Sequence, residues 1–220
     1  MIGWISALAL AVGTQVPPPP TDPRLEAFKA ACVPHRQDMP KTAEALAADG
    51  WERVADDDHP RLAAAMVVAR ANGSDPELQM TTDYSVWGRT RDGLRLHVVL
   101  SRVDAVIGET EDSDGDGVIQ EWERANPWIQ VGCGLWDFEA TGPVDHAAMN
   151  AWVGAEPVQV IDAPGQIAGG TWNVHHMMPG TGEVHMGYIP EGGGMQIAPG
   201  FAGLSITMSS ALPEEAAEAE

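Results

Sequence analysis

One short acidic segment carries most of the chemistry that this sequence suggests. Residues 112–123 read DSDGDGVIQEWE, and within these twelve positions they carry the carboxylates of Asp112, Asp114, Asp116 and Glu123. So many negative charges in so little chain repel one another unless a cation neutralises them. Hard oxygens of this kind suit Ca²⁺, whereas Mg²⁺ prefers a tighter octahedron and keeps its waters. The segment therefore predicts a calcium site.

The same segment resembles the calcium loop of EF-hand proteins at every diagnostic position. The resemblance implies ligands from Asp112, Asp114, Asp116, the backbone carbonyl of Val118, a water held by Gln120, and Glu123. It covers these twelve residues alone, because residues 102–111 make a poor entering helix and Pro127 ends any exiting one. We therefore expect an EF-hand-like loop inserted between two strands, with a structural role. The alternative is an acidic, solvated turn that binds nothing.

A second segment, residues 175–186, is rich in histidine and methionine and reads HHMMPGTGEVHM. Its Pro-Gly-Thr-Gly run predicts a hairpin loop, and a register that pairs Met178 with Glu183 sets His176 opposite His185. Imidazole and thioether ligands favour Cu(I). The alternative function is therefore a periplasmic metal-dependent enzyme or a copper-binding protein, although surface imidazoles are the simpler interpretation. A pocket shared by His97, His175 and His185 would favour the metal-dependent function.

The overall composition excludes some classes of partner. The chain has 220 residues, with 12 Lys and Arg against 32 Asp and Glu, so its net charge is −20. Nucleic acids and anionic membranes bind basic patches, and this chain offers none. Apolar residues make up 44% of the chain, which is enough for a folded core. We find no nucleophile elbow, zinc-protease motif or phosphate loop, so no catalytic residue is predicted and enzymatic activity stays open.

The two ends of the chain predict export. Residues 2–12 are an unbroken apolar run, typical of a secretory signal peptide and too short for a stable membrane span. A buried N-terminal helix is the alternative. We expect a signal peptide and a proline-rich spacer over 1–20, a single α+β domain over 21–212, and an acidic tail over 213–220. The protein would then be secreted or periplasmic.

Two cysteines, Cys32 and Cys133, are the only ones in the chain. In an exported protein such a pair favours a disulfide, the alternative being two buried thiols. Leu25 and Phe28 share a helix face with Cys32, which therefore points inward. The order of helix, Cys32, helix and Gly50-Trp51 is similar to that of small exported proteobacterial proteins of unknown function, a resemblance that implies no activity.

The pattern of turn residues and hydrophobic periodicity predicts helices first and strands later. We expect helices near 22–32, 40–49, 61–72 and 143–152, and strands near 84–89, 94–103, 128–138, 158–162, 167–177, 184–189 and 204–208. This order predicts an α+β fold with N-terminal helices packed on a mainly antiparallel sheet. Asp56, Asp57 and Asp58 precede the third helix. We interpret them as charges that favour a helix N-terminus rather than as metal ligands.

Overall fold

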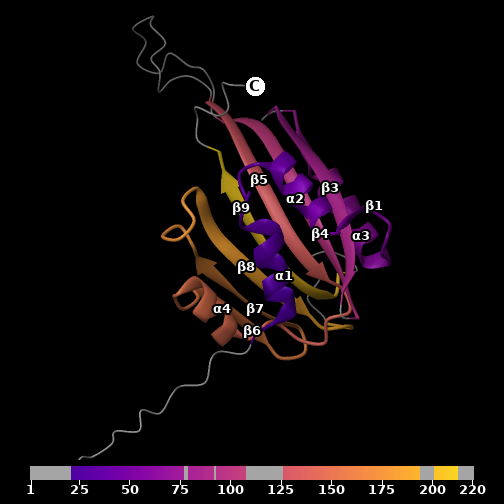
Figure 1. The fold of residues 1–220 in the computed structure, drawn as a ribbon, viewed down its shortest axis with the longest axis vertical. Coiled ribbons are helices and arrows are strands. Elements are labelled where there is room, and N and C mark those ends of the chain that lie inside the picture. Colours follow the sequence, from indigo (N-terminus) through magenta and orange to yellow (C-terminus); the bar gives the residue numbers. More distant parts are fainter. Residues whose placement is uncertain (1–20, 77–78, 92, 108–125, 194–200, 213–220) are drawn as a thin grey trace, which may run out of the picture.

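The computed structural model describes residues 21–76, 79–91, 93–107, 126–193 and 201–212. These residues form four helices and a nine-stranded, mainly antiparallel sheet, which confirms the predicted α+β class (Figure 1). The helices are α1 (Pro23–Cys32), α2 (Met39–Ala48), α3 (Pro60–Ala71) and α4 (His146–Val153). The strands are β1 (Glu52–Val54), β2 (Ser74–Asp75), β3 (Met80–Arg91), β4 (Leu94–Ile107), β5 (Asn126–Asp137), β6 (Gln159–Ala163), β7 (Ile167–Asn173), β8 (Thr181–Ile189) and β9 (Gly203–Ala211).

The last strand of the chain lies in the interior of the sheet. The strand order is β1-β3-β4-β5-β9-β8-β7-β6, with β2 paired to β3 off this path. Strand β9 pairs with β5 on one side and with β8 on the other. It therefore joins the half of the sheet built from the earlier strands to the half built from β6, β7 and β8 (Figure 1).

Local sequence explains where the helices begin and end. Asp22, Asp38 and Asp145 each accept a hydrogen bond from a backbone N–H at the start of α1, α2 and α4. Proline occupies the first turn of α1, α2 and α3, where its missing N–H costs nothing. Gly50 and Gly154 follow α2 and α4 with φ of +80° and +74°. Glycine takes this left-handed conformation without strain, so it stops a helix readily.

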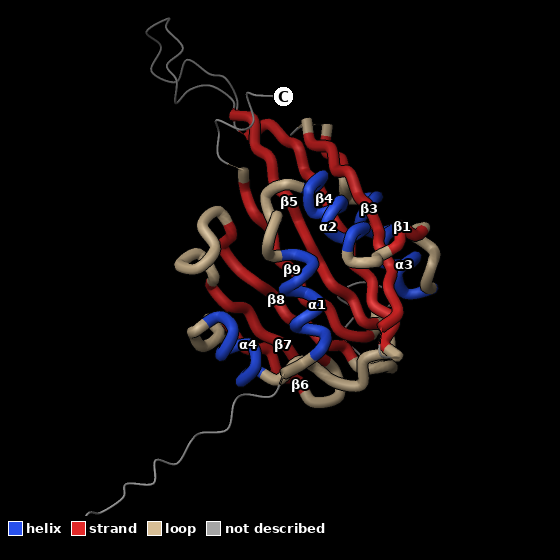
Figure 2. Tube along the Cα trace, viewed as in Figure 1, coloured by secondary structure: helices blue, strands red, loops and turns tan. Residues whose placement is uncertain are grey.

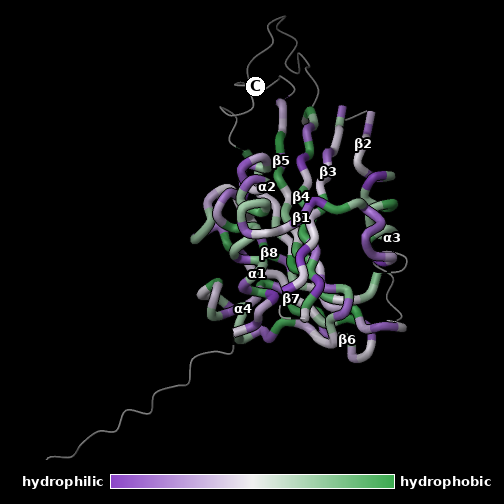
Figure 3. Tube along the Cα trace, turned by 45° about the vertical axis from the view of Figure 1, so that its right-hand side comes forward, coloured by the Kyte–Doolittle hydropathy of each residue, from purple (hydrophilic) through white to green (hydrophobic). Residues whose placement is uncertain are grey.

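Helices cover the two faces of the sheet unequally. Figure 2 shows α1, α2 and α4 in front of the strands, and Figure 3 shows α3 on the opposite side. Alternate residues of a strand point to opposite faces. In β4, Val98 and Leu100 join the large apolar cluster under α1, α2 and α4, whereas Val99 joins a small cluster under α3. We call these sides the first face and the second face.

The observed strands differ from the predicted ones mainly at their ends. Strands β3 and β4 are longer than predicted, because they pair from Thr81 and Asp104 to the turn at Arg91 and Leu94. Strands β1 and β2 are too short to show an alternating pattern and were not predicted. Strand β7 ends at Asn173 rather than at residue 177. No helix in the described ranges is both long enough and apolar enough to cross a membrane.

Candidate functional site

The predicted calcium loop, residues 112–123, lies outside the described residues. The structure does describe the strands on either side of it. Strand β4 ends at Ile107 and strand β5 begins at Asn126, and these two residues are paired across the sheet. Arg102 to Ile107 lie in β4, so they form a strand where an EF-hand would have its entering helix. The segment that contains the loop thus connects two neighbouring antiparallel strands.

The predicted register of the histidine and methionine hairpin is wrong. Strand β7 pairs with β8 so that His185 faces Thr171 and Asn173 faces Glu183. After Asn173 the chain leaves the sheet in a tight turn, in which Met178 N–H donates to the Val174 carbonyl at 2.8 Å. Both of these turn residues are buried. Burial of their apolar side chains favours the turn over two more pairs of strand residues.

The two histidines therefore have separate surroundings. His176 Nε2 lies 3.1 Å from the Val153 carbonyl, while His185 Nδ1 lies 3.1 Å from the Thr171 hydroxyl. Within the described ranges no three His, Cys, Asp or Glu side chains are grouped as metal ligands. His97, His175 and His185 accordingly do not form the common pocket that would favour a metal-dependent enzyme. The pairing that suggested a shared copper ion is absent.

The predicted disulfide is present. Cys32 and Cys133 are bonded, with their Cα atoms 5.6 Å apart, and both side chains are buried. The bond ties the last residue of α1 to the middle of β5. Disulfides persist in oxidising compartments, so this bond fits an extracellular protein. Both cysteines are used, so neither is available as a nucleophile.

A polar cluster beside the start of α3 was not predicted from the sequence. Asp58 lies just before the helix, and its carboxylate accepts from Arg95 at 2.5 Å and contacts His97 Nε2 at 2.9 Å. His97 comes from β4 and its side chain is only 1% exposed. Because an ionised carboxylate only accepts hydrogen bonds, His97 Nε2 must carry the proton. His97 Nδ1 is then a buried acceptor, and it has no hydrogen-bond partner.

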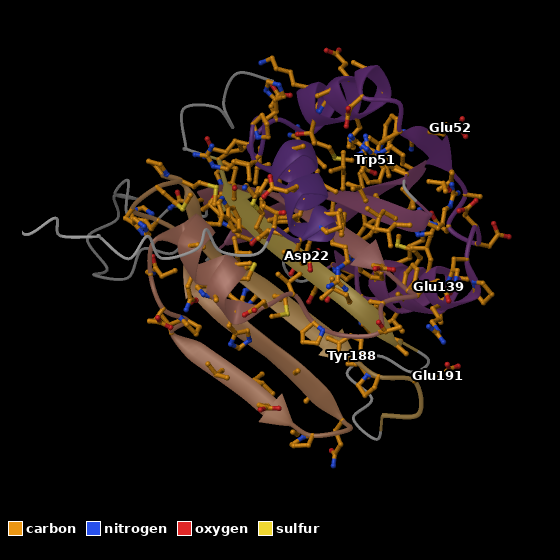
Figure 4. All side chains as sticks on the ribbon, turned by 60° about the horizontal axis from the view of Figure 1, so that its bottom comes forward. Asp22, Trp51, Glu52, Glu139, Tyr188 and Glu191 are labelled. Carbon is orange, nitrogen blue, oxygen red and sulfur yellow. A yellow bond between two sulfur atoms is a disulfide. The ribbon has the colours of Figure 1, made fainter. Side chains whose placement is uncertain are left out.

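His59 extends this cluster to the surface. Its Nδ1 accepts from the Arg61 backbone N–H at 3.2 Å and so caps α3, while its Nε2 lies 3.2 Å from the Glu139 carboxylate. The ring stacks on Phe138, with centroids 4.6 Å apart. Arg61 also donates to the Phe138 carbonyl and to Glu191. Glu139 and Glu191 accordingly lie on the same side of the molecule, beside the start of α3 (Figure 4).

Burial and charge shift two pKa values in the cluster. Burial lowers the pKa of His97, against the opposing effect of the hydrogen bond to Asp58. The pKa of the Asp58 carboxyl is lowered, first by the hydrogen bond from Arg95 and then by the one from His97. Since His97 Nδ1 is inaccessible, it cannot exchange protons with a bound substrate. The arrangement is suited to fixing the start of α3 and to making its attachment depend on pH.

The structure gives specific partners to two of the three aspartates before α3. Asp58 binds residues of β4, and Asp56 forms an ion pair of 2.5 Å with Arg70 in the last turn of α3. The N-cap itself is His59. Asp58 and His97 are 39 positions apart and belong to different elements, so no local pattern links them. The only sequence signal for this cluster was His97, a histidine among the apolar residues of a predicted strand.

Comparison of the chain with protein-family models, with curated proteins and with solved structures finds no match. Its function must therefore be argued from its own residues.

Proposed function

We propose that this protein is an exported calcium-binding protein whose EF-hand-like loop, residues 112–123, has a structural role. The observation that carries the proposal is the chemistry of the donor set. Every implied ligand is a hard oxygen, from Asp112, Asp114, Asp116, Val118, Gln120 and Glu123. Calcium prefers this set, whereas copper and zinc favour nitrogen and sulfur. Bound calcium would neutralise four carboxylates that otherwise repel one another.

The strands on either side of the loop support a structural role for the ion. Asp112 follows the paired residue Ile107 by five positions, and Glu123 precedes Asn126 by three. Most hairpin loops have about 2–5 residues, and a connection as long as 108–125 costs more entropy to close. An ion that binds ligands near both ends of this connection would offset part of that cost. Calcium binding is therefore expected to stabilise the pairing of β4 with β5.

The proposed export of the protein agrees with a calcium-binding role. The Cys32–Cys133 disulfide fits an oxidising extracellular space. We assign residues 2–12 as the signal peptide that directs the chain there. Calcium modules outside the cell bind with dissociation constants of about 10⁻⁴–10⁻³ M, and we expect this range here.

The test is a calcium titration of the chelator-stripped protein, followed by calorimetry and by thermal unfolding. At 10 mM Ca²⁺ the wild type should gain about 1.4–2.7 kcal/mol for dissociation constants of about 10⁻³–10⁻⁴ M. Glu123→Gln removes the implied bidentate ligand and should abolish this gain. Glu121→Gln is the matched control, because it makes the same change two positions earlier at a residue that is not an implied ligand. Equal responses in all three proteins, or none in the wild type, would contradict the proposal.

A further inference from the structure

One cavity opens on the first face of the sheet, beside the end of the β3–β4 hairpin. Its volume is about 490 Å³, within the range of small-molecule sites. Helix α1 makes its main contacts with β5 and β9, and helix α2 with β4 and β1. The space between α1 and the hairpin end stays open.

The cavity has an apolar floor and basic side chains on one wall. Ala27 of α1 and Leu96 of β4 are buried in the floor, next to Leu94. Arg89 and Arg91 line the wall from β3. These arginines are two positions apart on the strand, so they point to the same face. They pair across the hairpin with the two leucines. An occupant would thus meet apolar surface and guanidinium groups together.

Arg89 is held in place before any ligand arrives. Its guanidinium lies 4.5 Å from the centre of the Trp51 ring, and its Nη1 donates to the Asp49 carbonyl at 2.9 Å and to the Asp49 carboxylate. Trp51 lies beside α1 and α2 (Figure 4). Arg89 Nε has no hydrogen-bond partner in the structure, although it is buried. Because Nε is inaccessible, a ligand carboxylate would have to approach the part of the Arg89 side chain that is exposed, which is 11% of it.

The charged side chains that line the cavity balance one another, with Glu26 and Asp49 against Arg89 and Arg91. Its two acidic side chains already have basic partners, since Asp49 pairs with Arg89, and Glu26 pairs with Lys29 at 2.8 Å. Two of the 12 basic residues of this strongly acidic chain line this one cavity. A negatively charged ligand is repelled by most of the molecular surface. It is repelled less at this cavity, where two arginines balance the two carboxylates.

We propose that the cavity between α1 and the β3–β4 hairpin binds a small organic acid, with its carboxylate on Arg89 and its apolar body on the leucine and alanine floor. A planar guanidinium binds a carboxylate with defined geometry, and the apolar floor gains from burial of the ligand body. This site uses none of the predicted calcium ligands. It is independent of the proposed function.

The test is isothermal titration of the full chain with octanoate and with phenylacetate, with and without calcium. Octan-1-ol, which lacks the charge, and acetate, which lacks the apolar body, are the matched ligands. We expect both acids to bind and both matched ligands to bind at least 10-fold more weakly. Arg89→Gln should weaken binding of the acids about 10- to 150-fold, the equivalent of a hydrogen bond to a charged group.

A second variant keeps the test valid if Arg89→Gln unfolds the protein. Ala30 is exposed and lines the cavity, so Ala30→Phe should fill it without disturbing the core. Ala47→Phe makes the same change at an exposed position of α2 that does not line the cavity. Binding lost in Ala30→Phe and kept in Ala47→Phe would support the site. Absence of acid binding in the wild type, equal binding of octan-1-ol, or unchanged binding in Ala30→Phe would overturn the proposal.

Discussion

The two faces of the sheet are held to their helices by different interactions. On the first face, one large apolar cluster includes buried residues of α1, α2 and α4, and a disulfide links α1 to β5. On the second face, the buried apolar cluster among the described residues is small and comprises Leu62, Met66, Val86, Val99 and Phe138. There the start of α3 depends on Asp58, His59 and His97. The helices of the first face are thus held by apolar burial and a disulfide, whereas the attachment of α3 to the second face depends on titratable side chains.

The largest expected effect comes from removing the covalent bond of the first face. The disulfide spans a sequence separation of 101 residues, and in the chain-entropy model a bond of this span stabilises by about 4–5 kcal/mol. Cys32→Ala combined with Cys133→Ala should lower the free energy of unfolding by about this amount in urea titrations. The control is reductant, which should destabilise the wild type but leave the double variant unchanged. Equal stability of the wild type and the double variant in the absence of reductant would contradict the prediction.

A smaller and more local effect is expected on the second face. Leu62 of α3 is fully buried in the small cluster, and Leu62→Ala should cost about 2–3 kcal/mol, because a small cluster can partly collapse around the lost volume. Hydrogen exchange should accelerate in α3 and stay slow in α1. Val67→Ala, on the same helix at a side chain that is 70% exposed, should change stability by less than about 0.5 kcal/mol. Equal acceleration in α1 and α3 would contradict the proposed independence of the two faces.

The smallest expected effect is a pH dependence confined to the second face. The pKa of His97 is lower in the folded protein than its unfolded value of about 6.5, so the unfolded chain binds more protons near that pH. Stability from this group is present above about pH 6.5 and is lost as the pH falls towards the folded pKa. Unfolding should therefore take up as much as about one extra proton in this window.

His97→Gln should remove this uptake and the accompanying acceleration of hydrogen exchange in α3. His175→Gln is the matched control, because His175 is exposed on the turn after β7. Denaturant titrations from about pH 7.5 to 5 measure the slope of the unfolding free energy against pH. The same slope in wild type and in His97→Gln would show that the buried histidine does not control the attachment of α3.

Features with local causes were predictable from the sequence. Cys32 points inward because helical periodicity places it on one face with Leu25 and Phe28, and all three are buried. The turn between β3 and β4 follows from Gly93, whose φ is +81°, and the strand pairing runs up to Arg91 and Leu94. In each case the residues that fix the structure lie within a few positions of one another.

The end of β7 was wrongly predicted because the sequence signal there is ambiguous. Residues 174–178 have the apolar content of a strand, yet Val174 and Met178 are buried by a turn and not by further pairing. A shift of the strand end changes which histidines face each other, so the assumed copper pair depended entirely on it. The calcium ligands depend on local spacing alone and remain a prediction.

The sequence by itself determined the boundaries of α1, α2 and α3 to within one residue and the common face of Leu96, Val98 and Leu100, and it predicts the oxygen-rich ligand set of residues 112–123. These follow from capping, periodicity and spacing within a short stretch of chain. Only the tertiary structure decided that β9 lies between β5 and β8, that Asp58 meets His97, and that α1 and the hairpin enclose a cavity beside Arg89. Each of these depends on which distant segments pack together, and the energy of that packing is not recorded in any local pattern.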